Sequence, residues 1–292
     1  MNLGLGIKLL IYRASSSKIG KSLLSFMSFG ISVNGLNGKN KPKKHKFIVA
    51  ITTDTESGYV EGSERRVWQI ENPKAYQGYY YGIGNLLNIF KKYKIKTTFF
   101  ISTNCFSSKG KELILIKKEL NKLIKNKHEI GLHLHPDSDL ALQHKLSRKF
   151  PATSAFFYDY GEKLELVSAA KKLVEENIGA NAEKNLVSFR WGNWAIDTDG
   201  AKAIGEFGFK IDSSAVPGIK GHSDDTMKYD WSKVSMHYPW KLSTLDYQSI
   251  SHNSGVTEIP IATFSFFGIK MRADPVNSVL LEKAFLEYYN ND

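Results

Sequence analysis

Cysteine is nearly absent from this chain of 292 residues, which contains only Cys105. A single cysteine excludes an intrachain disulfide and a zinc site built from several thiolates. Any metal ion that the chain holds must therefore be bound by histidine, aspartate or glutamate. With 42% hydrophobic and 12% aromatic residues, the composition is that of a folded protein, and the length suits one large α/β domain or two smaller ones.

The first part of the chain lacks an apolar run long enough to cross a membrane. Residues 23–33 are apolar apart from interruptions by Ser and Gly, whereas a membrane-spanning helix needs about 20 residues. The stretch has the length of a signal-peptide core, but it starts late and no small-residue cleavage site follows it. We expect residues 1–46 to be a basic leader and linker, partly disordered or forming a docking helix. For the compartment we favour the cytoplasm or the cytoplasmic face of the membrane, and we leave secretion open.

Acidic residues are missing from the same leader. Residues 1–46 carry nine lysines and arginines and no aspartate or glutamate, which leaves only +2 of the total net charge of +11 for residues 47–292. This near-neutral body argues against a basic binding face on the folded domain and against specific binding of nucleic acid. The leader itself could contact phosphate groups or an anionic membrane surface, but a solvated arm is the simpler interpretation.

Residues 47–292 contain apolar runs that alternate with helical patterns, which predicts one domain built on a parallel α/β sheet with right-handed crossovers. The run 47–51 is continuously β-prone and suits a strand buried on both faces. In such sheets ligands bind at the carboxyl ends of the strands. We expect strands at 47–51, 96–101, 128–135, 186–190, 209–212 and 258–261, and helices at 85–93, 111–125, 164–174, 201–207 and 274–289.

Two histidines end the strand expected at 128–135. Side chains alternate between the two faces of a strand, so Leu132 and Leu134 share one face while His133 and His135 share the other. Residues two apart on one face have Cα atoms roughly 6.5–7 Å apart, which lets both imidazoles reach one metal ion. Unpaired imidazoles are costly to bury on an apolar strand, so this pair indicates a metal site.

Two acids end an earlier strand, in the sequence Thr52-Thr53-Asp54-Thr55-Glu56. Asp54 and Glu56 face the same way if the strand persists, and paired carboxylates allow one to bind a metal ion while the other takes a proton from water. Taken alone, such a pair is more often a helix cap or a turn. Together with the two histidines, it makes a hydrolytic metal site the leading hypothesis.

An arginine, Arg190, ends the strand at 186–190 and needs a carboxylate partner. A pair with Asp54 would orient that acid and keep it ionised, and a salt bridge to a neighbouring helix is an equal alternative. Two tryptophans follow, Trp191 and Trp194. They could stack on a sugar ring, or they could belong to the core.

The order of these segments over residues 48–262 resembles that of the polysaccharide deacetylase family, the NodB homology domain of carbohydrate esterases. Each segment alone is a loose match, and their number and order make the resemblance specific. The matching segments are an acidic motif at 52–56, a threonine-phenylalanine strand at 96–102, a histidine motif at 129–136, an arginine motif at 188–194, and Gly208-Phe209-Lys210-Ile211-Asp212-Ser213-Ser214.

This resemblance implies a distorted (β/α) barrel with fewer than eight strands and a divalent metal ion, most often Zn²⁺. The implied reaction removes N-acetyl groups from an amino sugar in a polysaccharide or its precursor, so the implied partner is a glycan. By position, Asp54 would be the catalytic base, Arg190 would hold it, and Glu56 and His133 would bind the metal. Trp191, Trp194 and Asp212 would bind substrate.

The sequence departs from the family pattern at two places. The second histidine of the family's commonest pair falls at Asp137, so the second ligand is either His135, which we favour, or Asp137. The late leucine-histidine motif that supplies the general acid is not found, and His222, His237 and His252 do not match it. The alternative function is therefore a non-catalytic glycan-binding protein on a degenerate deacetylase scaffold.

Overall fold

The structure is a computed structural model that describes residues 49–57, 73–221, 228–251 and 255–273, together with residues 280, 281 and 284. Two compact units are distinguished: a larger one of residues 50–215 and 220–260, and a smaller one that includes residues 216–219 and 261–292. Each is described by itself. The leader 1–46 and most of the helix expected at 274–289 lie outside the described residues, so the predicted boundary at residue 46 stays a prediction.

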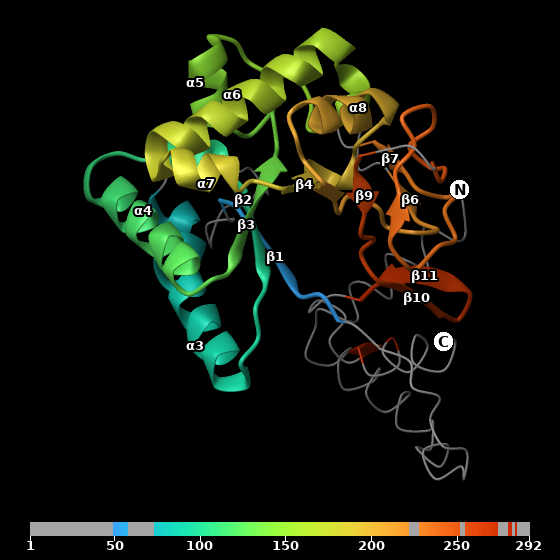
Figure 1. Cartoon of the computed structure of the whole chain (residues 1–292), viewed down its shortest axis with the longest axis horizontal. Helices are drawn as coiled ribbons and strands as arrows, with labels where there is room; N and C mark the ends of the chain where they lie inside the picture. Colours follow the sequence, from blue (N-terminus) through green and yellow to red (C-terminus); the bar gives the residue numbers. More distant parts are fainter. Residues whose placement is uncertain are drawn as a thin grey trace. The chain divides into compact units, whose positions relative to one another are not determined.

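A seven-stranded sheet organises the larger unit, in the order β1-β2-β3-β4-β5-β9-β8. Strands β1 to β4 and β9 are labelled in Figure 1. All neighbouring pairs are parallel except the last, β8 with β9. The predicted class, an α/β fold with fewer than eight strands, is confirmed. The strands are β1 (Thr52–Thr55), β2 (Thr98–Ser102), β3 (Glu129–Leu134), β4 (Ser188–Trp191), β5 (Ile211–Asp212), β8 (Trp240–Lys241) and β9 (Thr257–Glu258). A short hairpin of β6 (Lys220–Gly221) and β7 (Tyr229–Asp230) belongs to the same unit.

Helices connect the parallel strands, as the alternating pattern predicts. The stripe Ile116, Leu120 and Leu123 of α4 is fully buried, because residues three and four apart share one side of a helix. The α-helices are α3 (Ile83–Tyr93), α4 (Gly110–Lys125), α5 (Leu140–Leu146), α6 (Tyr160–Ile178), α7 (Ala180–Lys184) and α8 (Thr198–Glu206). Short 3₁₀ or π turns lie at Pro73–Tyr76, Gly78–Gly82, Thr103–Ser107, Ala155–Phe157 and Gly192–Trp194.

Aspartates begin three of these helices. The side chain of Asp159 accepts a hydrogen bond from the backbone N–H of Glu162, whose own carboxylate accepts from the N–H of Asp159, which is a capping box. Asp139 and Asp197 cap α5 and α8 more simply, because each side chain accepts a hydrogen bond from one backbone N–H. These caps explain where the helices start more closely than the apolar stripes do.

The first strand was predicted in the wrong place. The apolar run at 47–51 suggests a buried strand, but β1 begins at Thr52, and Ile51 is 37% exposed. The reason is that β1 lies at the edge of the sheet and pairs only with β2, through Thr52–Thr55 and Thr98–Ile101. Phe47 and Ile48 lie outside the described residues. The shift places Asp54 within the strand and Glu56 just after its end.

The centre of the sheet is closely packed. Phe99, Ile101, Leu132 and Phe189 are fully buried. Gly131 lies in β3 against the ring of Phe100, where a Cβ would come within 2.6 Å of a ring carbon. A glycine is required there because two strands and an aromatic ring meet at van der Waals distance.

The smaller unit contains an antiparallel hairpin of β10 (Thr263–Phe266) and β11 (Ile269–Arg272). Both turn residues, Phe267 and Gly268, have positive φ, which is the geometry of a tight hairpin turn. Phe264 and Phe266 pack with Leu280 and Ala284 in a small apolar cluster. In the described part of the chain, no helix combines the length and the hydrophobicity that crossing a membrane requires.

Candidate metal centre

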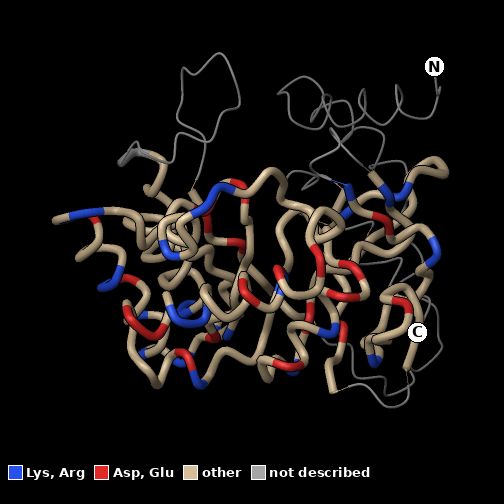
Figure 2. Tube along the Cα trace, turned by 90° about the horizontal axis from the view of Figure 1, so that it is seen from above, with Lys and Arg blue, Asp and Glu red and all other residues tan. Residues whose placement is uncertain are grey.

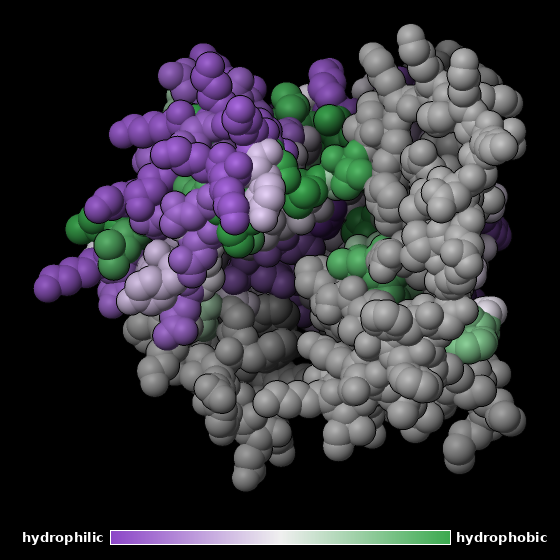
Figure 3. Space-filling model, turned by 90° about the horizontal axis from the view of Figure 1, so that it is seen from below, coloured by the Kyte–Doolittle hydropathy of each residue, from purple (hydrophilic) through white to green (hydrophobic). Residues whose placement is uncertain are grey.

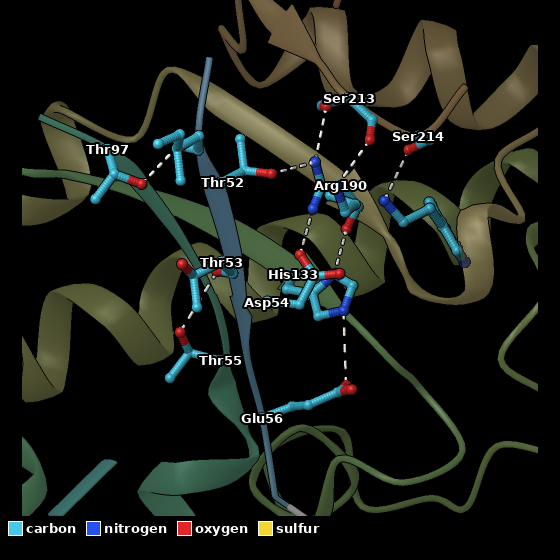
Figure 4. Close-up of polar contacts among 12 residues, drawn as sticks. Thr52, Thr53, Asp54, Thr55, Glu56, Thr97, His133, Arg190, Ser213 and Ser214 are labelled. Atoms are coloured by element: carbon cyan, nitrogen blue, oxygen red, sulfur yellow. Dashed lines mark hydrogen bonds and ion pairs between the residues drawn. The ribbon is translucent and has the colours of Figure 1, made fainter. Parts of the chain in front are cut away.

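The candidate residues meet because their strands run parallel. Asp54 lies in β1, His133 in β3 and Arg190 in β4, while Glu56 and His135 directly follow β1 and β3. The register sets His133 beside Arg190 on the neighbouring strand. Figure 4 shows Asp54 and Glu56 on the side of β1 that faces His133 and Arg190. The prediction that the two strand ends meet is confirmed.

Three ligating atoms converge at the carboxyl ends of β1 and β3. The Nε2 atoms of His133 and His135 lie 3.0 Å apart. A carboxylate oxygen of Glu56 lies 3.0 Å from Nε2 of His135 and 3.6 Å from Nε2 of His133. Both imidazoles are almost fully buried, whereas the side chain of Glu56 is 29% exposed. The group is the cluster of metal-ligating side chains found among the described residues.

A backbone carbonyl fixes the tautomer of His133. Its Nδ1 lies 3.0 Å from the carbonyl oxygen of Arg190. A carbonyl oxygen can only accept, so Nδ1 carries the hydrogen and Nε2 of the neutral ring presents a lone pair. A partner of this kind behind the ring is typical of histidines that bind metal ions. The lone pair is directed toward His135 and Glu56.

The donor set fits a divalent ion such as Zn²⁺. Two ring nitrogens 3.0 Å apart can coexist only with a proton or a cation between them, because lone pairs repel. Ligands at about 2.0–2.1 Å from a tetrahedral ion are about 3.3 Å apart, and the three separations, 3.0, 3.0 and 3.6 Å, lie on either side of that value. Two imidazoles and one carboxylate are also a common three-ligand set of catalytic zinc sites, in which a further position stays open.

The charges of the cluster are strongly coupled. Burial lowers the pKa of His133, and this effect outweighs the nearby acids, so the ring stays neutral as a ligand must be. Burial also acts on His135, but the Glu56 carboxylate beside it raises the pKa of His135 overall. For Glu56, burial raises the pKa and the two histidines, His135 most strongly, lower it below its ordinary value.

Asp54 forms a separate ion pair beside the cluster. Its carboxylate contacts the guanidinium of Arg190, and the side chain of Asp54 remains 32% exposed. Burial raises the pKa of Asp54, but Arg190 and then His133 outweigh it, so the pKa lies below its ordinary value. Of the two partners weighed for Arg190, Asp54 and a neighbouring helix, the structure selects Asp54.

Arg190 is itself held on several sides. Its Nε donates to the carbonyl of Ser213 at 2.8 Å, and its Nη2 lies 2.9 Å from the hydroxyl of Ser213 and 3.0 Å from that of Thr52. The guanidinium also lies over the ring of Phe100, 4.3 Å from its centre. The arginine is therefore fixed in the orientation that meets Asp54 (Figure 4).

The other candidate for the second ligand, Asp137, does not join the cluster. Its carboxylate accepts a hydrogen bond from the hydroxyl of Thr153 instead. His135 joins the cluster in place of Asp137, and Gly192 leaves room for its ring. The ring of His135 lies on Gly192, where a Cβ would come within 2.7 Å of three ring atoms. The geometry therefore favours His135, as expected from the strand alternation.

Two residues that were predicted to contact substrate, Trp191 and Asp212, have no exposed surface. Trp191 is fully buried, and its indole N–H donates to the carbonyl of Thr153 at 2.7 Å, so it belongs to the core. Asp212 is also fully buried and accepts from the hydroxyl of Ser214 at 2.8 Å. Trp194 is half-buried against the ring of Tyr229, and its contact with substrate stays a prediction.

Among the three later histidines, His222 and His252 lie outside the described residues. His237 is exposed in the segment 228–251.

Several supporting residues could not be identified from the sequence. The hydroxyl of Tyr79 lies 2.6 Å from the carbonyl of Thr55 and 3.2 Å from that of Ser102, which ties the ends of β1 and β2 together. Nothing in the run Tyr79-Tyr80-Tyr81 distinguishes one tyrosine from the others. The amide of Asn104 donates to the hydroxyl of Ser57, which holds the chain just beyond Glu56.

Comparison by sequence with protein-family models and with curated proteins gives no match. Solved structures do show similarity. A "putative polysaccharide deacetylase" from Mycobacterium smegmatis shares 16% identity with a TM-score of 0.49, over 83% of this chain and 72% of that chain. The deacetylase PplD of Streptococcus pyogenes, in complex with acetate, shares 13% identity with a TM-score of 0.37, over 71% of this chain and 75% of that chain.

A third structure is a mutant of BA3943, described as a CE4 family pseudoenzyme with restored enzymatic activity. It shares 15% identity with a TM-score of 0.33, over 55% of this chain and 42% of that chain. With identities this low and TM-scores below 0.5, the function has to be inferred from the geometry of the site.

Proposed function

We propose that this chain is a metal-dependent hydrolase that removes N-acetyl groups from an amino sugar in a polysaccharide or its precursor. One observation carries the proposal: two buried imidazoles and one carboxylate are directed at a single point, beside a second carboxylate that an arginine holds ionised. This arrangement separates the metal-binding acid from the acid that is free to take a proton.

Glu56, His133 and His135 would hold the metal ion. When bound, a divalent ion polarises the substrate carbonyl and makes water a stronger acid. His133 and His135 are buried, and only Glu56 is partly exposed. The acetyl group would therefore have to approach the metal ion from the exposed side, near Glu56. The Arg190 carbonyl keeps His133 in the tautomer with a free Nε2.

Asp54 would act as the general base. Its pair with Arg190 keeps it ionised, and its 32% exposure leaves one side of the carboxylate open to water and substrate. An attacking water that donates one hydrogen to Asp54 becomes more nucleophilic as it approaches the acetyl carbon. The proton taken by Asp54 must then reach the leaving amine, directly or through another acid.

Acetate release from N-acetylated oligosaccharides tests this function. With one equivalent of Zn²⁺ the protein should release acetate, and Asp54→Asn should lower the rate by at least about a hundredfold. The Asn side chain keeps the size of Asp54, so a folded variant isolates the loss of the base. Glycan binding by both proteins without acetate release would overturn the proposal and favour the non-catalytic alternative.

A further inference from the structure

Lysines of the larger unit are frequent in residues 91–127. Residues 91–127 contain eleven lysines and two glutamates, a net charge of +9, whereas the rest of residues 47–292 carries −7. The near-neutral average of the body therefore conceals a strongly basic segment. Figure 2, which shows the chain from above, has basic and acidic positions interspersed over the larger part of the trace.

These connections lie at the amino ends of the parallel strands, at the edge opposite the metal centre. The last turn of α3 and its connection to β2 carry Lys91, Lys92, Lys94 and Lys96, and the last turn of α4 and its connection to β3 carry Lys122, Lys125 and Lys127. We call these seven residues the lysine edge. The ammonium group of Lys96 donates to the carbonyl of Asn126 at 2.5 Å, which shows that the two connections are adjacent.

Few acids compensate the lysine edge. Among its seven lysines, only Lys122 forms an ion pair in the described part of the chain, with Glu119. Glu129 begins the neighbouring strand but turns its carboxylate to the hydroxyls of Thr98 and Ser188. The attraction of the helix dipole for cations accounts for lysines in a last turn, but Lys94, Lys96 and Lys127 lie beyond the last helical residues.

Two of these lysines occupy backbone positions that favour other residues. Lys94 and Lys127 have φ of 55° and 57°, and each closes a helix with the paired hydrogen bonds of a Schellman motif. Glycine is the usual residue at this position and asparagine an alternative, because a Cβ is strained in the left-handed region. Both helix ends thus keep a positive charge where an uncharged residue would fit the backbone better.

The same two helices, α3 and α4, also carry exposed apolar side chains. Tyr93 is 62% exposed, Ile89 is 50% exposed and Ile124 is 41% exposed. From below, the left side of the described surface is mostly hydrophilic, with separate hydrophobic groups within it (Figure 3). Lysines on the same helices as exposed aromatic and aliphatic side chains suit the head-group region of a bilayer, where the charges meet anionic lipid and the apolar groups insert.

We propose that the lysine edge is a docking surface for an anionic lipid bilayer. A bilayer is favoured over nucleic acid because phosphate backbones offer no partner for Ile89 and Ile124. The metal centre lies at the other end of β3, about 20 Å away for six residues of extended strand. The docked protein would therefore turn its site away from the lipid, toward glycan that extends from the membrane.

Vesicle binding by the full-length protein tests this surface. The probes are vesicles of phosphatidylcholine with and without phosphatidylglycerol, with binding measured by co-sedimentation. The variant Lys94→Asn/Lys127→Asn removes two charges and places a residue that tolerates left-handed φ at both positions. Lys149→Asn/Lys233→Asn is the matched control, because these exposed lysines lie outside both connections. Every variant retains residues 1–46, so the basic leader contributes equally to each.

We expect the native protein and the control to bind the anionic vesicles and to be released by salt. The lysine-edge variant should bind the anionic vesicles at least about tenfold more weakly. Binding equal to that of the control would overturn the proposal. Tyr93→Ser separates the bilayer from nucleic acid: it should weaken vesicle binding and leave binding to a DNA duplex unchanged. If Tyr93→Ser lost binding to DNA alone, or if it bound vesicles as the native protein does, the bilayer assignment would also be contradicted.

Discussion

At the residue scale, Arg190 serves two neighbours through different parts of itself. Its side chain contacts Asp54, and its backbone carbonyl accepts from Nδ1 of His133. A side-chain substitution should therefore disturb the base and spare the metal ligand. The distinction allows the two halves of the site to be tested independently.

Arg190→Lys should reduce acetate release by about a hundredfold while metal affinity stays within a few-fold of native. A lysine has one ammonium group and cannot reach Asp54, Thr52 and Ser213 at the same time, as the guanidinium does. Steady-state rates and calorimetric zinc titration measure the two effects. Parallel loss of zinc affinity and rate would show that the side chain also supports the ligands.

Gly192→Ala should weaken zinc binding by about tenfold or more. The added methyl group would occupy the space of the His135 ring, with three ring atoms at 2.7 Å, so the buried ring must move away from its ligating position. Gly255→Ala is the matched control, because nothing lies within 4 Å of its Cβ position. Equal zinc affinity in both variants would mean that the orientation of His135 does not depend on Gly192.

The residue roles differ in how far the sequence determines them. Strand alternation was sufficient to predict that His133 and His135 point the same way, because two-residue periodicity is a local property. It could not decide whether Trp191 lines the site or packs inside, since a tryptophan suits both positions equally. Nor could it show that Asp212 faces a second acid, because Glu258 is distant in sequence.

At the element scale, β5 and β9 are joined by a pair of buried acids. Asp212 and Glu258 are paired in register, both are fully buried, and each carboxyl group affects the pKa of the other. One oxygen of each, Oδ2 and Oε2, meets no N–H or O–H donor. If one acid carries a proton and donates it to the other, both of these oxygens gain a hydrogen-bond partner. Burial and then the charge of Asp212 raise the pKa of Glu258 well above its ordinary value.

Glu258→Gln should make the protein less sensitive to alkaline pH. Because the folded-state pKa of Glu258 is raised, its contribution to stability is complete below the unfolded-state value and is lost as the pH rises through the folded-state pKa. Glutamine keeps the bond from the N–H of Ala215 and offers an N–H to Asp212 without a proton to lose. Denaturant unfolding of both proteins across pH 4.5–9 should show the fall only in the native chain, and a fall of the same size in the variant would refute the shared proton.

Several of the expected elements are present, whereas α5, α7, β8 and the two hairpins were not predicted and the first strand was misplaced. Helices α3 and α4 lie where the apolar stripes place them, because amphipathic spacing and tertiary burial agree. The strand at 47–51 was misplaced because a run of β-prone residues was taken for the strand itself. The paired residues are the threonines that follow, Thr52, Thr53 and Thr55, whose β-branched side chains suit an edge strand equally well.

At the scale of the whole molecule, charge is distributed unevenly, with +9 in residues 91–127 and −7 in the rest of residues 47–292. The net charge of +2 over residues 47–292 suggested that the body has no basic face. The fold brings the ends of α3 and α4 together at the amino ends of the strands, and only the topology shows that their lysines gather there. A total charge cannot reveal such a separation, since it contains no distances.

The two edges of the sheet thus have different chemistry. Acids, histidines and one arginine gather at the carboxyl ends of the strands, and lysines gather at the amino ends. This polarity follows from parallel topology, which sends every helix-to-strand connection to one edge and every strand-to-helix connection to the other. It separates the candidate metal centre from the proposed docking surface within the same unit.

Calorimetric titration of the metal-free protein with Zn²⁺ tests the central claim most directly, namely that Glu56, His133 and His135 share one divalent ion. We expect one equivalent of Zn²⁺ to bind and to raise the melting temperature, with affinity reduced by more than about a hundredfold in His133→Ala and in Glu56→Ala and unchanged in the surface variant His144→Ala. Native-like zinc binding in His133→Ala, or no binding by the native protein, would contradict the account.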